Sequence, residues 1–81
     1  MKLNSNAIIS SADGTFTAYL INQNKMYKLN KTAYFILNLF QEGDDLTEDK
    51  VIELCQKEFQ EFSIEEVSSY LSNLVELTLL E

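Results

Sequence analysis

Residues 27–40 read YKLNKTAYFILNLF, and the spacing of the apolar side chains changes in the middle of this stretch. Before Asn30, Tyr27 and Leu29 flank a lysine, which is the two-residue period of a β-strand. After Asn30 the apolar residues follow the helical period of about 3.6 and form one stripe, made of Ala33, Ile36, Leu37 and Phe40. We predict a strand that ends at Leu29, followed by a helix that Asn30 caps and that Gly43 stops after residues 41–42.

The chain before this stretch predicts two further strands. Residues 7–11 and 15–21 are rich in β-branched and aromatic side chains. Between them Asp13-Gly14 is a pair that favours positive φ in a two-residue hairpin turn. A polar turn at residues 22–24 then leads to the strand over Lys25–Leu29, which completes a three-stranded antiparallel meander.

The chain after this stretch predicts two further helices. Thr47 is a candidate N-cap for a helix that ends near Glu61. Residues 63–66 read SIEE, a capping box that begins a third helix running to about Thr78. We expect an α+β fold of winged-helix-like order, a three-stranded antiparallel sheet followed by three helices. Because no linker or repeat interrupts the chain, residues 1–81 should form a single domain.

The charge of the chain argues against nucleic acid as a partner. The formal net charge is −7, because 13 acidic residues outnumber 6 lysines. Winged-helix proteins that bind DNA do so through the third helix, but residues 63–78 contain no lysine or arginine and three glutamates. We therefore expect no binding to nucleic acid.

The sequence contains few residues that could carry catalysis or hold a metal. It has no histidine, so nucleophile and base pairs of the Ser-His or Cys-His kind cannot be built. Its one cysteine, Cys55, lies on the apolar stripe of the second helix, and we interpret it as a core residue rather than a reactive thiol. The acidic residues around the first interhelical loop are interpreted as a solvated cluster rather than a metal site; they are Glu42, Asp44, Asp45 and Glu48. We predict that the protein is not an enzyme and holds neither a cofactor nor a metal.

The same features predict a cytoplasmic location. A single cysteine cannot form an internal disulfide, and the N-terminal residues lack the apolar stretch of a signal peptide. No apolar run reaches the length of a membrane-spanning helix, so no membrane association is expected.

Residues 27–39 resemble the signature Y-x-L-N-x-T-(A/G)-x-x-I-x-x-L of PqqD-like proteins. The elements that follow are similar as well: a helix at residues 47–55, an aromatic at Phe59 and a last helix that leads into Leu79-Leu80. The resemblance covers about residues 7–80. Many relatives have a glycine before the final leucines, and this chain has Thr78 there.

The resemblance implies a function in peptide binding. PqqD-like proteins include the recognition elements for ribosomally made, post-translationally modified peptides (RiPPs). By this resemblance the chain would be a stand-alone peptide chaperone, a monomer or weak dimer. It would bind a precursor leader peptide as an added antiparallel strand and present it to a separate maturation enzyme, a radical-SAM protein or a leader peptidase. The alternative is a winged-helix scaffold that does not bind DNA and serves dimerisation or regulatory protein contacts.

The resemblance also implies the residues of the site. The docking edge would be the third strand, with Lys25, Met26, Tyr27, Lys28 and Leu29. The apolar wall of the groove would come from the third helix, with Val67, Tyr70, Leu71 and Leu74, although helical spacing leaves open which of these point into the core. The lysines at 25, 28 and 31 either pair with acidic leader residues or protect an exposed strand edge from aggregation, and the two roles can coexist.

Overall fold

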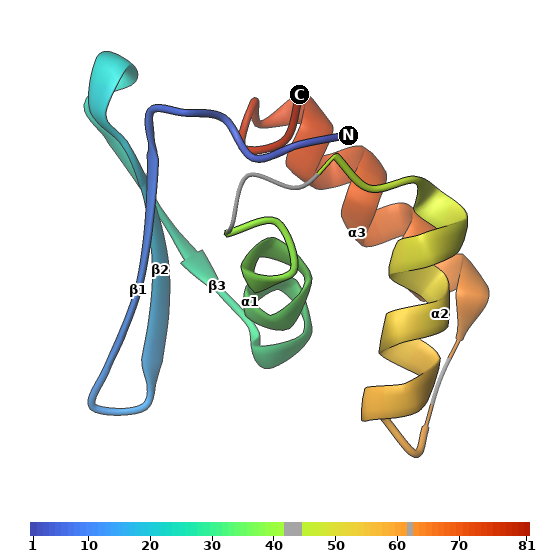
Figure 1. Cartoon of the computed structure of the whole chain (residues 1–81). Helices are drawn as coiled ribbons and strands as arrows, with labels where there is room; N and C mark the ends of the chain where they lie inside the picture. The colour runs from blue at the N-terminus through green and yellow to red at the C-terminus, as the bar shows by residue number, and fades with distance from the viewer. Residues whose placement is uncertain (42–44, 62) are drawn as a thin grey trace.

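A computed structural model of the chain describes residues 1–41, 45–61 and 63–81. Three strands are followed by three helices, as the sequence predicts (Figure 1). The winged-helix likeness of this order stays a prediction. Across the described ranges, no helix combines the length and the apolar character that crossing a membrane requires. The elements are β1 (Ala7–Ala12), β2 (Thr15–Leu20), a 3₁₀ turn (Ile21–Gln23), β3 (Lys25–Leu29), α1 (Lys31–Asn38), α2 (Glu48–Glu58) and α3 (Ile64–Glu76).

The sheet is a meander in the order β1-β2-β3, with both pairs antiparallel. At the β1–β2 turn, Asp13 and Gly14 have φ values of 53° and 76°, the two positive values that the Asp-Gly pair predicts. Leu20, which pairs with Ala7 on β1 and Lys25 on β3, is fully buried against the helices. The meander leaves β3 at one edge of the sheet.

All three predicted N-caps are present. In each helix the capping side chain accepts a hydrogen bond from the backbone N–H three residues further on. The distances are 2.8 Å for Asn30 and 3.2 Å for both Thr47 and Ser63. A cap of this kind contributes about 1 kcal/mol, because it satisfies a donor that the helix itself cannot.

The helix ends differ from the prediction. α1 ends at Asn38 rather than after residues 41–42, because the N–H groups of residues 39–41 bond to carbonyls three residues back and tighten the last turn. α2 ends at Glu58 rather than near Glu61. The next residue, Phe59, has extended backbone (φ −107°, ψ 133°), and its ring packs edge-on against Phe35 at a centroid distance of 5.2 Å.

Two predictions fall on the first interhelical loop. The predicted end of the first helix at Gly43 lies outside the described residues. The acidic cluster lies partly outside them, at Glu42 and Asp44. Of its other two members, Glu48 is the first residue of α2, and Asp45 accepts a hydrogen bond of 2.8 Å from the N-terminal ammonium group. This ammonium group holds the pKa of the Asp45 carboxyl below its ordinary value.

α3 ends at Glu76, two residues before the predicted end, in a Schellman motif. Thr78 has a left-handed backbone, with φ of 65°. The N–H of Leu79 bonds to the carbonyl of Leu74, and the N–H of Thr78 bonds to the carbonyl of Val75, both at 3.0 Å. The Thr78 carbonyl accepts a further hydrogen bond of 2.8 Å from the buried side chain of Asn4. Glycine adopts this left-handed conformation without strain, whereas a β-branched threonine does not.

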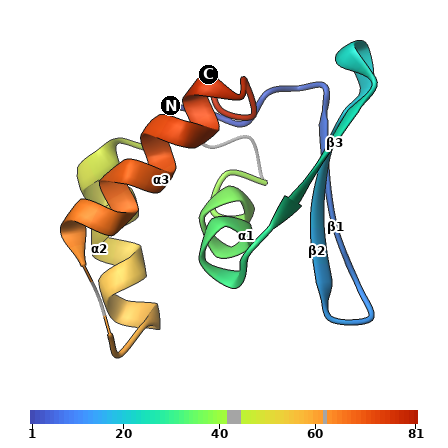
Figure 2. The ribbon, with the colours of Figure 1, turned by 180° about the vertical axis from the view of Figure 1, so that it is seen from behind.

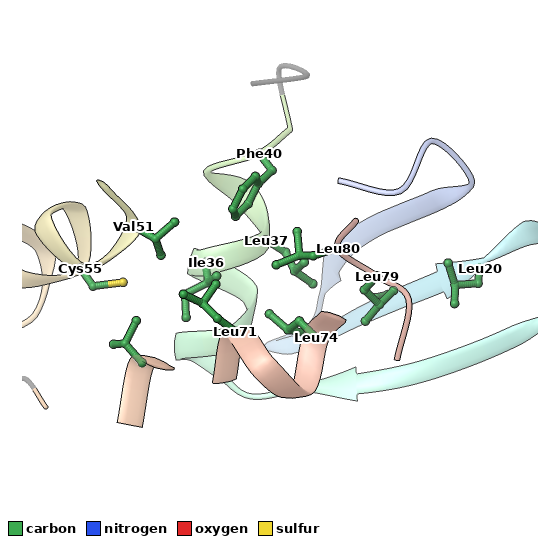
Figure 3. Packing of buried hydrophobic residues seen from close by; sticks show 12 residues of the cluster. Leu20, Ile36, Leu37, Phe40, Val51, Cys55, Leu71, Leu74, Leu79 and Leu80 are labelled. Carbon is green, nitrogen blue, oxygen red and sulfur yellow. The ribbon is translucent and has the colours of Figure 1, made fainter. Parts of the chain in front are cut away.

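The sheet and the helices share one hydrophobic core (Figure 3). α1 lies between the sheet on one side and α2 and α3 on the other (Figures 1 and 2). Cys55 is fully buried there, and burial raises the pKa of its thiol, which agrees with its interpretation as a core residue. The cluster is made of Ala18, Leu20, Ile36, Leu37, Phe40, Val51, Cys55, Val67, Leu71, Leu74, Leu79 and Leu80.

The N-terminal segment holds the C-terminal residues in place, and the two ends of the chain lie together (Figure 2). Lys2 and Glu81 exchange two backbone hydrogen bonds, of 2.9 and 2.7 Å, next to a bridge between Leu3 and Leu80. These bonds anchor the segment after α3.

Replacing Thr78 with glycine should stabilise the protein. A β-branched side chain in the left-handed region is strained, and glycine is not. We therefore expect Thr78→Gly to raise the free energy of unfolding by about 1 kcal/mol, although it removes the exposed hydrogen bond of 3.1 Å that the Thr78 hydroxyl accepts from the Gln23 side chain. Urea unfolding at 25 °C measures this change. The control is Asn24→Gly: Asn24 has φ of 52°, but asparagine tolerates this region and its side chain bonds to the Tyr19 hydroxyl, so no gain is expected. A Thr78→Gly variant less stable than the parent would contradict the assignment of strain.

Candidate functional site

The outer edge of β3 offers an unused set of backbone hydrogen bonds. In the part of the chain that the structure describes, β3 pairs with β2 and with no other strand. In an antiparallel sheet every second residue of an edge strand directs its N–H and C=O away from its partner. The outward groups of Lys25–Leu29 can therefore pair with an extended segment of another chain.

The side chains of β3 alternate between the two faces of the sheet. Tyr27 and Leu29 are half-buried, and their partners on β2 are Ala18 and Phe16, on the face that the helices cover. Met26, with an exposed fraction of 66%, points to the opposite face. The edge thus has an inner side, beside the helices, and an outer side.

A cavity of about 190 Å³ lies between β3 and α3, and we call it the β3–α3 hollow. Sites for small molecules and cofactors usually have volumes of 300 Å³ or more, so this hollow is better suited to a side chain or two of a larger partner. Its lining is made of Tyr27, Lys28, Leu29, Asn30, Ala33, Tyr70, Asn73, Leu74 and Leu77.

Asn30 joins α1 to α3 at this hollow. Its side-chain oxygen accepts the N–H of Ala33 and caps α1, while its amide nitrogen donates to the hydroxyl of Tyr70. Because the Tyr70 oxygen accepts this bond, the phenolic hydrogen is left to donate elsewhere. The pair therefore fixes the position of the Tyr70 ring and places a polar group beside an apolar cavity.

The nine residues predicted from the sequence fall into three groups. Five of them line the β3–α3 hollow, namely Tyr27, Lys28, Leu29, Tyr70 and Leu74. Val67 and Leu71 belong to the core and do not line the hollow, with exposed fractions of 3% and 1%, whereas Leu74, at 2%, belongs to the core and also lines the hollow. Lys25 and Met26 are exposed on β3 but do not line the hollow. The structure thus separates the residues that helical spacing left undecided, and the role of all nine in peptide binding stays a prediction.

Four lining residues are absent from the prediction. Asn30 and Ala33 are interpreted from the sequence only as a cap and as part of the buried stripe of α1. Asn73 and Leu77 follow Tyr70 by three and seven residues, with Leu74 between them, so the four form a single helical stripe. This spacing was a signal in the sequence, because a groove wall built on Tyr70 would include its neighbours at i+3 and i+7.

The lysines near the edge have no acidic partner among the described residues. The described side-chain ion pairs involve Lys50 and Lys57, both with Glu53 on α2. The side chains of Lys25, Lys28 and Lys31 are exposed instead. These three positive charges lie along β3 and the start of α1, in a protein whose net charge is −7.

A second cavity, of about 250 Å³, involves the other side of α1. It is lined by two aromatic pairs, with Phe16 stacked on Tyr34 at 4.4 Å and Phe35 edge-on to Phe59. Asn38 lines it as well, and no residue lines both cavities. Substitutions in this aromatic cavity therefore provide controls for substitutions in the β3–α3 hollow.

Comparison with known proteins identifies one family and one related structure. The family model described as coenzyme PQQ synthesis protein D (PqqD) matches residues 17–80. The structure of TbiB1 in complex with the TbiA(beta) leader peptide superposes with a TM-score of 0.77. At 18% sequence identity, the alignment covers 100% of this chain and 95% of that one, which shows that the two share a fold. None of the curated proteins compared with the chain matches it.

Substitutions at Asn30 should separate its two roles. Asn30→Ala removes both the cap and the bond to Tyr70, so we expect the free energy of unfolding to fall by about 1 to 2 kcal/mol. Asn30→Ser keeps a capping oxygen but loses the amide donor, so most of the stability should return. Thermal and urea unfolding measure both variants. Equal losses in the two would show that the bond to Tyr70, not the cap, carries the effect.

Proposed function

This chain belongs to the PqqD family, and we propose that it binds the leader segment of a ribosomally made precursor peptide by strand addition to β3. The observation that supports this function is the open edge of β3 beside the β3–α3 hollow. An open strand edge provides backbone hydrogen bonds to any extended segment, and the adjacent cavity provides selection among side chains.

The bound leader would become a fourth, antiparallel strand. Its backbone would pair with the outward N–H and C=O groups of Lys25–Leu29. Every second side chain would point to the helix side, where Tyr70, Leu74 and Leu77 offer an apolar wall. Val67 and Leu71 would support this wall from the core rather than touch the leader.

The comparisons support the same function. TbiB1, whose fold this chain shares, is a protein seen in complex with a leader peptide. In both the family match and the structural alignment, the matched region includes β3 and α3. Because the two chains share a fold, a leader peptide bound by TbiB1 supports a leader peptide as the partner of this chain.

We propose further that the chain acts by presentation rather than by catalysis. The sequence has no histidine, and its one cysteine is buried, so it offers no nucleophile paired with a histidine base and no accessible thiol. The modifying or processing step would belong to a separate enzyme, a radical-SAM protein or a leader peptidase. Residues 1–81 would act as one domain, in the cytoplasm where ribosomes make the precursor.

Leader binding at β3 can be tested with the short precursor encoded nearest to the gene of this protein. A synthetic peptide of its leader segment should bind the monomer and slow amide exchange at Lys25–Leu29. Tyr70→Ala should weaken binding about ten-fold or more, because it removes a wall of the β3–α3 hollow. Asn38→Ser, in the aromatic cavity, should leave the affinity within about two-fold. Isothermal titration calorimetry and exchange monitored by NMR provide the two measurements.

Two results would contradict the proposal. The first is a peptide that binds without protecting β3, which would locate the site elsewhere. The second is a constitutive dimer in which a second copy pairs with β3, since it would favour a dimerisation scaffold. Analytical ultracentrifugation of the free protein distinguishes a dimer from the monomer that we expect.

The lysines of β3 should strengthen leader binding through charge. We expect the double variant Lys25→Glu and Lys28→Glu to lower leader affinity about ten-fold at low salt, and to make it less sensitive to added salt. The control is the double variant Lys50→Glu and Lys57→Glu on α2, which changes the net charge equally but away from the edge. If the β3 variant bound the leader with unchanged affinity, these lysines would have no role in leader binding. Their remaining role would be to protect the strand edge from aggregation.

A further inference from the structure

The face of the sheet that the helices leave open carries an aligned row of apolar side chains. All three helices lie on one side of the sheet (Figures 1 and 2). On the other side, Ile8 pairs with Tyr19, and Tyr19 pairs with Met26. Ile8 is 52% exposed and Met26 is 66% exposed. These three residues form what we call the outer row, which crosses the sheet and ends at the open edge of β3.

The next row on the same face is polar. Ser10 pairs with Thr17, their hydroxyl oxygens lie 2.8 Å apart, and Thr17 pairs with Lys28 on β3. The outer side of the β3 edge therefore presents two different side chains, the apolar Met26 and the positively charged Lys28. Single exposed apolar residues are common on protein surfaces, but here the register of the strands aligns two of them, Ile8 and Met26, on either side of the half-buried Tyr19.

From this arrangement, and on the basis of the proposed function, we infer the sequence class of the leader. The bound segment contains four consecutive residues in the order apolar, acidic, apolar, apolar, which face Leu29, Lys28, Tyr27 and Met26 respectively. The first and third enter the helix side, at the β3–α3 hollow, and the second and fourth lie on the outer face. The fourth residue extends the outer row onto the added strand.

Two physical terms support this pattern. The Cβ atoms of side chains directly opposite each other in an antiparallel pair lie about 4.5 to 5.5 Å apart. At this distance an apolar leader residue opposite Met26 covers exposed apolar surface. An acidic leader residue opposite Lys28 forms an ion pair with it. A shift of one residue would move every side chain of the leader to the other face. Contacts on both faces of the added strand therefore specify the register of the leader more strictly than contacts in the hollow alone.

A selection from random peptides tests the inference with the intact chain. Ten-residue peptides displayed on phage are selected for binding, and the enriched sequences are synthesised. NMR exchange shows whether they protect Lys25–Leu29, and cross-strand NOEs identify the peptide residue that faces Met26. We expect enrichment of the four-residue pattern. We also expect the peptides to bind Met26→Thr about three- to five-fold more weakly, since threonine keeps the strand but removes the apolar contact.

The matched control is Ile8→Thr. It makes the same kind of change in the outer row but on β1, which β2 and β3 separate from the added strand, so affinity should stay within about two-fold. Urea unfolding of both variants confirms that the sheet is intact.

The outcomes separate the inference from the proposed function. Peptides that protect β3 but show no apolar preference opposite Met26, or that bind Met26→Thr as tightly as the parent, would overturn the inference and leave the function standing. Failure to enrich any peptide, or enrichment of peptides that leave β3 unprotected, would overturn the proposed function and the inference with it.

Discussion

The burial of α1 between the sheet and the other two helices is the packing on which the rest of the structure depends. Ile36, Leu37 and Phe40 are fully buried, and the apolar residues of β2 and α3 meet them from opposite sides. Fully burying side chains of this size stabilises a fold by about 1.5 to 3 kcal/mol each. Because α1 occupies this central place, α3 does not pack directly on the edge of β3, and the space between them remains as the β3–α3 hollow.

The beginning of α1 connects this packing to the candidate site. Asn30 ends the strand region, caps the helix and bonds to Tyr70 on α3. One side chain, directly after the end of β3, thus caps α1 and holds a residue in the wall of the hollow. The bonds between Asn4 and Thr78, and between Lys2 and Glu81, hold the segment that follows α3. The helix beside the open edge is therefore anchored at its middle, through Tyr70, and just after its C-terminal end.

The local signals in the sequence predicted element types and helix starts well. Asp13-Gly14 predicted the first turn, and Asn30, Thr47 and Ser63 predicted the caps, because each effect involves only neighbouring residues. Helix ends were predicted less well. α2 ends early where the Phe59 ring packs on Phe35, and that contact joins residues far apart in the sequence. For the candidate site, periodicity identified the apolar arc of α3 but did not divide it between core and hollow.

By itself, the sequence determined the order of the strands and helices, the caps, the alternation along β3 and the absence of histidine, since all of these depend on residue type and short-range spacing. Only the tertiary structure decided that Tyr70, Asn73, Leu74 and Leu77 line the hollow beside β3, while Val67 and Leu71 lie in the core without lining it. Leu74 belongs to both. The rotation of α3 about its axis is set by how Leu71 and Leu74 fit against α1, not by the period of its apolar residues. The open edge of β3 is likewise a property of the assembled sheet, because it depends on which strands pair and on where the helices lie.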